Sequence, residues 1–250
     1  MSAPTSLRPT GDRATRKVRA VAERHRARLG ELRHVESSSP PPRVVVWTVV
    51  ILGALSVGVF LQGGGIGGIV GVVLAYVVIA VVILVFLGGE KILVLERGIL
   101  IGSFAPFLTP YALGFDQVDA RSISANLAGP RGISLLLAHR GAGRASRTVP
   151  WSLRSLTFTA AAPAVVRHHA ARGGAPVTDP RFFVLWSFSV RHPRRLAPLV
   201  HALASAMQAA GVPGADDITS HALPPRRLHR TVADADRLRI PAGDRAPGLR

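Results

Sequence analysis

The sequence predicts two transmembrane helices that form a membrane α-hairpin, joined to a small α+β cytoplasmic domain. That domain is expected to be an antiparallel sheet or barrel capped by a C-terminal helix. Three observations predict this class. Residues 44–89 hold no charged residue and no histidine, whereas the 250-residue chain has 31 Lys and Arg and 14 Asp and Glu elsewhere. Short runs rich in β-branched residues and leucine follow this block. A pattern of helical period comes last.

The uncharged block has room for two spans. Residues 44–62 and 66–87 would extend about 28 Å and about 33 Å as helices at 1.5 Å per residue, close to the roughly 30 Å hydrocarbon core. The stretch Gln62-Gly63-Gly64-Gly65 has the backbone freedom to reverse the chain. Basic residues lie on both sides of the block, so we expect a multi-pass protein of the cell inner membrane with both termini in the cytoplasm.

Small residues recur at four-residue spacing in both spans. They are Ala54 and Gly58 in the first, and Gly67, Gly71 and Ala75 in the second. Such spacing places them on one face of each helix, where small side chains let two backbones approach closely. We expect helix packing at these five positions, either within one chain or between copies in a homo-oligomer. The alternative is that glycine is simply common in membrane spans.

Residues 1–43 are predicted to be a basic N-terminal arm that is partly disordered. Apolar residues near helical spacing mark its centre: Val18, Val21, Ala22, Leu29, Leu32 and Val35. Two interpretations stay open. The centre is either a basic amphipathic helix lying on the anionic inner leaflet, or a solvated, partly helical tail that serves the charge rule for insertion.

Residues 90–211 are predicted to form the α+β domain. Residues 91–102 are expected to hold two strands around the turn Glu96-Arg97-Gly98. Another strand is expected to start at Arg121. Residues 132–140 and 147–159 are expected to be strands on either side of a loop, and residues 181–190 to be the last strand. A short helix is expected over residues 163–172. The last helix starts near Pro193 and stops at Gly211. Residues 212–250 are expected to be a disordered tail.

The order of these elements resembles that of bacterial membrane proteins with a pleckstrin-homology-like domain. The likeness begins with the predicted transmembrane hairpin, which leads directly into "ILVLERGILIG" at residues 92–102. It continues with "GFDQVDARSISANL" at residues 114–127 and ends with the terminal helix after the last strand. The likeness covers roughly residues 44–211 and rests on order and pattern, without a diagnostic motif. The additional helix within residues 163–180 departs from the simple pattern. The resemblance implies a lipid- or protein-binding scaffold without catalysis.

No catalytic, cofactor-binding or metal-binding residue stands out. The chain has no cysteine, which excludes disulfides, thiolate metal sites and a cysteine nucleophile. His168 and His169 are adjacent on a predicted helix and therefore point about 100° apart, which does not suit a shared metal. Asp116 and Asp119 have no His or Glu nearby in sequence to complete a metal site. We therefore expect a non-enzymatic protein without a cofactor.

The formal net charge of +17 indicates the kind of partner. Arg191, Arg194 and Arg195 cluster before the last helix and are candidates for contact with lipid headgroups or an acidic protein partner. The alternative is that they are ordinary surface arginines. We expect binding of a protein partner or of lipid headgroups at the bilayer. A membrane-anchored nucleic-acid-binding protein is the second hypothesis, because basic arms neutralise phosphates, but no base-reading motif supports it.

Overall fold

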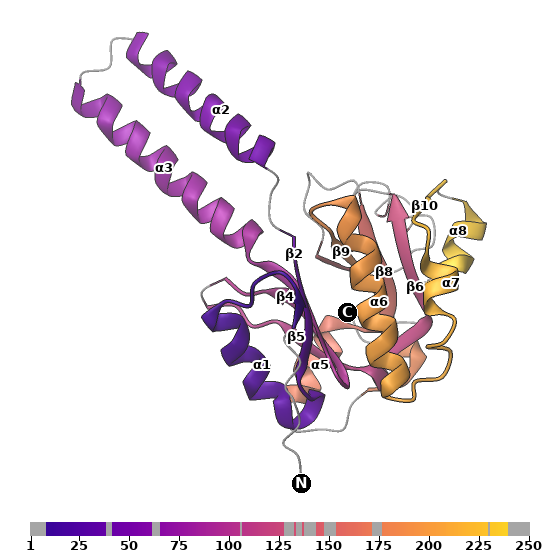
Figure 1. Cartoon of the computed structure of the whole chain (residues 1–250). Helices are drawn as coiled ribbons and strands as arrows, with labels where there is room; N and C mark the ends of the chain where they lie inside the picture. Colours follow the sequence, from indigo (N-terminus) through magenta and orange to yellow (C-terminus); the bar gives the residue numbers. More distant parts are fainter. Residues whose placement is uncertain are drawn as a thin grey trace.

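The computed structural model describes residues 9–38, 42–61, 66–105, 107–127, 133, 137, 144–147, 154–171, 177–229 and 231–239. It is an α+β structure with two five-stranded sheets (Figure 1). The single antiparallel sheet or barrel that the sequence predicted is therefore wrong, because strands from both ends of the chain join the sheets. The first sheet, called sheet A, has the order β1-β2-β3-β4-β5, and sheet B has the order β10-β6-β8-β9-β7.

The strands are β1 Thr10–Gly11, β2 Leu32–Ser37, β3 Glu90–Leu95, β4 Gly98–Ser103, β5 Tyr111–Gly114, β6 Val118–Leu127, β7 Arg144–Arg147, β8 Ser155–Ala161, β9 Phe183–Ser189 and β10 Arg226–Arg227. The α-helices are α1 Arg16–Leu29, α2 Pro42–Leu61, α3 Ile66–Gly88, α5 Pro163–Ala171, α6 Leu196–Ala209, α7 Ile218–Ala222 and α8 Val232–Arg237. Short 3₁₀ turns are η1 Phe115–Gln117, η2 Pro180–Phe182 and η3 Pro193–Arg195.

Sheet A takes in the N-terminal arm. Strand β2 pairs antiparallel with β3, with Val35 opposite Leu93, and β1 adds in parallel to β2. Helix α1 is capped by Thr15, whose hydroxyl accepts from the N–H of Val18, and it ends at Gly30. Its apolar face packs on the outer side of sheet A. That face is buried by protein, so both interpretations of the arm as a lipid-bound or solvated segment are corrected.

Sheet B differs from the predicted strand pairing. The expected strand over residues 132–140 is wrong where the structure describes it, because Ile133 and Leu137 are helical. Strand β7 lies partly within the expected loop and pairs in parallel with β9. A short apolar run does not distinguish strand from helix, which explains the error. The expected disordered tail also contributes structure, since β10 pairs with β6 and Leu238 of the tail is buried.

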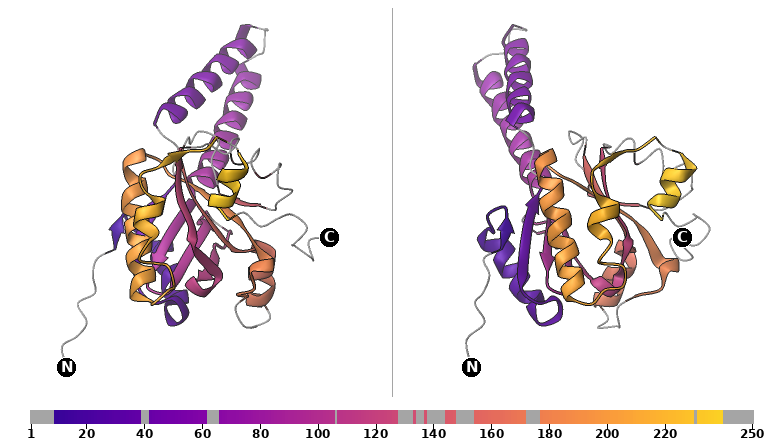
Figure 2. Two further views of the ribbon diagram at one scale, coloured as in Figure 1. Left: turned by 90° about the vertical axis from the view of Figure 1, so that its right-hand side faces the viewer. Right: turned by 45° about the vertical axis from the view of Figure 1, so that its right-hand side comes forward.

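The main core lies between the sheets and under α6 (Figure 2). Trp186 is fully buried there, stacks at 6.3 Å on Phe158 and donates its indole N–H to the carbonyl of Ala161 at 3.1 Å. The predicted last helix is confirmed as η3 followed by α6. Gly211 adopts φ 70° and ends it, and the N–H of Val212 donates back to the Met207 carbonyl.

Helices α2 and α3 form an apolar pair that projects from the body (Figures 1 and 2). Both segments were predicted as helices and are helical, whereas the turn at residues 62–65 lies outside the described residues. In the part of the chain that the structure describes, no helix combines the length and the apolar character needed to cross a membrane.

This finding corrects three expectations. The transmembrane hairpin of residues 44–62 and 66–87 is not supported, and neither is a multi-pass location in the inner membrane with cytoplasmic termini. The resemblance to membrane proteins with a pleckstrin-homology-like domain falls with it, because the hairpin carried much of that likeness. The prediction rested on the length and the lack of charge of the apolar block, on the glycine turn and on the basic flanks, all of which are features of the sequence alone.

Candidate functional site

Strand β2 carries buried polar side chains on its α6-facing side. Side chains alternate along a strand, so Val35 faces α1 while His34 and Glu36 face the other way. Both are only 1% exposed. Their cross-strand neighbours on β3 are Val94 and Ile92, which belong to the main core. Two ionisable side chains therefore occupy positions that an apolar residue would normally fill.

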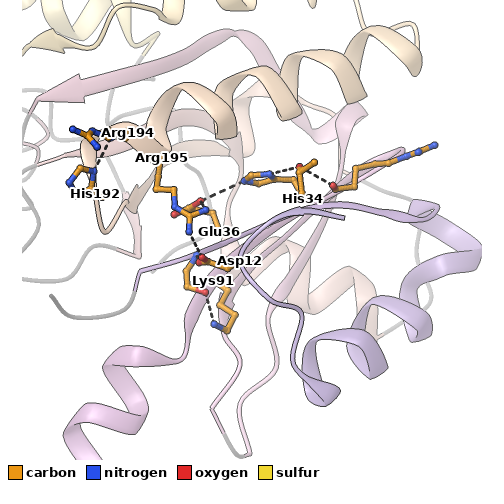
Figure 3. A network of polar contacts seen from close by, with 10 residues as sticks. Asp12, His34, Glu36, Lys91, His192, Arg194 and Arg195 are labelled. Atoms are coloured by element: carbon orange, nitrogen blue, oxygen red, sulfur yellow. Dashed lines mark hydrogen bonds and ion pairs between the residues drawn. The ribbon is translucent and has the colours of Figure 1, made fainter. Parts of the chain in front are cut away.

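A chain of contacts links these side chains to the N-terminal segment and to α6 (Figure 3). The Thr10 hydroxyl lies 2.8 Å from Nδ1 of His34. Nε2 of His34 lies 3.6 Å from Oε2 of Glu36, and this oxygen is 3.8 Å from a guanidinium nitrogen of Arg195. The other terminal nitrogen of Arg195 donates to Asp12 at 2.6 Å. The contacts thus connect β1, β2 and the start of α6.

The same chain continues to the base of the helical hairpin. Asp12 accepts from the backbone N–H of Ser37 at 3.0 Å, and the Lys91 ammonium donates to the Ser37 hydroxyl at 2.6 Å. Burial lowers the pKa of Lys91 below its ordinary value, while the negative charges of Asp12 and Glu36 oppose that shift. We call Asp12, His34, Glu36, Lys91 and Arg195 the polar network.

The polar network is suited to holding elements together. It balances the carboxylates of Asp12 and Glu36 against the positive charges of Lys91 and Arg195 in a partly buried setting, where an unpaired charge would be costly. His34 and Glu36 are closed to solvent, so they offer no reactive group to a substrate. Within the described ranges, no group of three His, Cys, Asp or Glu side chains is placed to hold a metal ion.

A groove of about 990 Å³ opens beside the network along α6. Thr10, whose hydroxyl contacts His34, belongs to its wall, so the groove adjoins the network. The lining residues are Thr10, Arg33, Glu96, Arg97, Pro198, His201, Ala202, Ser205, Ala206, Ala209 and Ala210. Pro198, Ala202, Ser205 and Ala209 follow helical spacing and therefore lie along one face of α6. Apart from His201, the lining residues from α6 are small. The groove therefore has a mainly small, apolar floor.

The groove has a charged edge at the turn between β3 and β4. Arg33 contacts Glu96 at 2.5 Å, and the other oxygen of Glu96 accepts the N–H of Glu31 at 3.0 Å. These contacts lower the pKa of Glu96, and the hydrogen bond from the Glu31 N–H has the largest effect. Arg97 donates to the Ala27 carbonyl at 2.9 Å. Two arginines against one carboxylate leave this edge positive.

A second hollow of about 500 Å³ shares Arg97 and Ala210 with the groove. It extends the depression around the C-terminal end of α6. Asp116 and Asp119, which the sequence offered as weak metal candidates, line this hollow. Asp119 is paired with Arg239 of the tail at 3.1 Å.

The structure separates the arginines that the sequence grouped together. Arg195 is held by Asp12 and Glu36 in the polar network. Arg191 and Arg194 are exposed, and the backbone N–H of Arg194 donates to the His192 ring at 3.2 Å. The three side chains therefore do not share one role, and only two of them are free to meet an external ligand.

The predicted helix-packing residues lie on the projecting hairpin, away from the groove. Ala54 and Ala75 are exposed. A Cβ atom built on Gly58, Gly67 or Gly71 would meet no described atom within 4 Å outside its own helix backbone. These three glycines therefore make no close contact with described atoms of the facing helix, and the packing role of the five positions stays a prediction.

The sequence prediction missed the polar network and the groove. The signal for β2 was the alternation His34-Val35-Glu36, but Leu32 and Val35 also fit helical spacing. The groove depends on the pairing of segments far apart in the chain, which no local pattern reveals. No family model, curated protein or solved structure matches the chain.

Proposed function

We propose that this chain is a non-catalytic binding protein that holds an acidic segment of a partner protein in the groove along α6. The observation that carries the proposal is the groove itself, with its small α6 side chains and the arginine-bearing edge at residues 96–97. An amphipathic helix laid in a groove is a recurring mode of peptide recognition. Small side chains at helical spacing let such a helix approach closely.

The volume and openness of the groove favour a protein segment. About 990 Å³ is at the upper end of the usual range for small-molecule sites, roughly 300–1,000 Å³. Such sites enclose most of their ligand, whereas His201, Ser205 and Ala209 are exposed along this groove. A surface groove of this kind accommodates one face of a helix while the other face stays in water.

Charge supports an acidic partner. The net charge of +17 attracts anionic surfaces and speeds their encounter. At the groove, Arg97 is exposed and His201 lies on α6 nearby. Carboxylates on the outer edge of a bound helix would meet these groups, while its apolar face would lie on Ala202 and Ala209.

A binding titration with the full chain tests the proposal. The probe is a synthetic amphipathic helix with a Leu and Ala face and a Glu face, and its Lys-substituted counterpart serves as the charge control. Any acidic peptide will bind weakly to a chain of charge +17, so groove variants are needed. Ala202→Trp fills the groove, whereas Ala20→Trp makes the same change on an exposed position of α1.

We expect the Glu peptide to bind better than the Lys peptide. Ala202→Trp should weaken it at least about tenfold, or about 1.4 kcal/mol, and Ala20→Trp should leave it unchanged. Equal affinity in both variants would refute the groove as the site. Tighter binding of duplex DNA with a steep salt dependence, or of anionic lipid vesicles, unaffected by Ala202→Trp, would refute the proposed function.

A further inference from the structure

We infer that the α2–α3 hairpin is an interaction surface whose occupant is the hairpin of a second copy of this chain. The described part of the chain exposes 19 large apolar side chains, and 16 of them lie on these two helices, eight on each. Val49 of α2 and Leu74 of α3 are 64% and 63% exposed. Exposed apolar side chains gathered on one element are typical of an interaction surface.

The hairpin is large enough for a stable interface. Helices α2 and α3 have 20 and 23 residues, so one face of the hairpin holds about half of these. A standard interface uses roughly 20–30 residues and about 800 Å² on each side. Contact along one face would therefore bury a standard interface. Such an area exceeds the largest apolar patch on an ordinary monomer, which is only about 300–600 Å².

The chemistry of the hairpin points to a second copy. Residues 44–89 have no charged group, so the occupant must also be uncharged and apolar over this length. The chain itself presents such a surface, and a two-fold contact requires only that one patch be complementary to itself. Two hairpins packed along one face would give a four-helix arrangement.

The position of the hairpin allows this contact despite the charge of the chain. Two copies of charge +17 repel each other. The hairpin projects from the body in every view (Figures 1 and 2), so two hairpins can meet while the bodies stay apart. Gly58, Gly67 and Gly71 have open space at their Cβ positions, so a second helix can come close there.

Single-cysteine variants of the full chain test the inference. The chain has no cysteine, so any disulfide in a single-cysteine variant joins two copies. Ala54→Cys and Gly71→Cys place the thiol on α2 and α3, and Ala20→Cys places it on an exposed part of α1 as the matched control. The readout is the rate at which cross-linked dimer appears on mild oxidation, measured on denaturing gels.

We expect the two hairpin cysteines to cross-link at least about tenfold faster than Ala20→Cys, because association holds the thiols at an effective millimolar concentration. Added salt should speed the reaction, since it screens the repulsion between the bodies. Rates equal to that of the control at both hairpin positions would overturn the inference. So would a monomeric mass for the cysteine-free chain in sedimentation, or burial of the hairpin in lipid vesicles without cross-linking.

This test is independent of the groove. Salt should weaken the binding of an acidic peptide to the groove but strengthen association through the hairpin. Ala202→Trp should leave the cross-linking rates unchanged, because Ala202 lies on the body. The two proposals can therefore fail separately.

Discussion

At the scale of single residues, the polar network explains how the N-terminal segment stays attached to α6. Arg195 is the link, because it contacts Asp12 from the N-terminal segment and faces Glu36 on β2. The side chain of Glu36 is 1% exposed, whereas those of Asp12 and Arg195 are 28% and 39% exposed. The buried Glu36 carboxylate is shielded from water and therefore relies on neighbouring groups to stabilise its charge. The more exposed Asp12–Arg195 pair is partly screened by water.

Removing Arg195 should be costly unless Glu36 is also neutralised. We predict that Arg195→Met lowers the free energy of unfolding by about 3 kcal/mol, because it leaves the buried Glu36 carboxylate without its arginine. This is the lower end of the range for breaking a buried pair, since Lys91 still faces the carboxylates. Adding Glu36→Gln should recover most of this loss. Urea unfolding of the single and double variants measures the coupling. Purely additive losses would show that the two residues act independently.

Lys91 should make stability depend on pH in the alkaline range. Its pKa is lowered in the folded chain from the ordinary 10.5. Between the lowered value and 10.5 the unfolded chain binds more protons, so the free energy of unfolding rises with pH through this window. Lys91→Met should lack this rise. Urea unfolding of both proteins from pH 7 to 10.5 measures the difference, and parallel pH profiles would contradict the assignment.

At the scale of elements, the sequence predicted what depends on local pattern. Helix α6 was predicted because its apolar positions follow helical spacing between Pro193 and Gly211. The turn between β3 and β4 was predicted from Glu96-Arg97-Gly98 and lies there. Both signals act over a few residues, so no distant part of the chain was needed to place them.

Elements stabilised by distant partners were missed. Strand β2 pairs with β3, so Val35 lies opposite Leu93 although helices α2 and α3 separate the two strands in the sequence. Strand β10 adds to β6 from the tail. The parallel pairings of β1, β7 and β10 also have no local turn to signal them. The candidate groove was missed for the same reason, because its walls come from α6 and from the β3–β4 turn.

The junction between α1 and β2 should be sensitive to a side chain at Gly30. Gly30 has φ 82°, and a Cβ atom there would lie 2.6 Å from Cβ of Glu96. We predict that Gly30→Ala costs about 1–3 kcal/mol of stability from strained backbone, and the clash adds to this. Gly211→Ala is the matched control, because Gly211 has φ 70° but open space around it. Urea unfolding compares them, and equal losses would exclude a role for the clash.

At the scale of the whole molecule, layers of structure cover both faces of sheet A. Helix α1 covers one face, and α6 with sheet B covers the other. This explains why β3 and β4 are near-continuous apolar runs instead of alternating ones. The charge and the apolar surface are also separated in space. The basic body carries the groove, and the uncharged hairpin projects from it (Figure 1).

The most direct test of the proposed binding function is photo-crosslinking from the groove in the cells that make the full chain. A benzoylphenylalanine in place of His201, at the groove wall, should form an adduct with a protein segment rich in Asp and Glu. The adduct should disappear when Ala202→Trp is added, and the same crosslinker at Ala20 should not form it. An adduct with nucleic acid or lipid, or a protein adduct that persists with Ala202→Trp, would contradict the account.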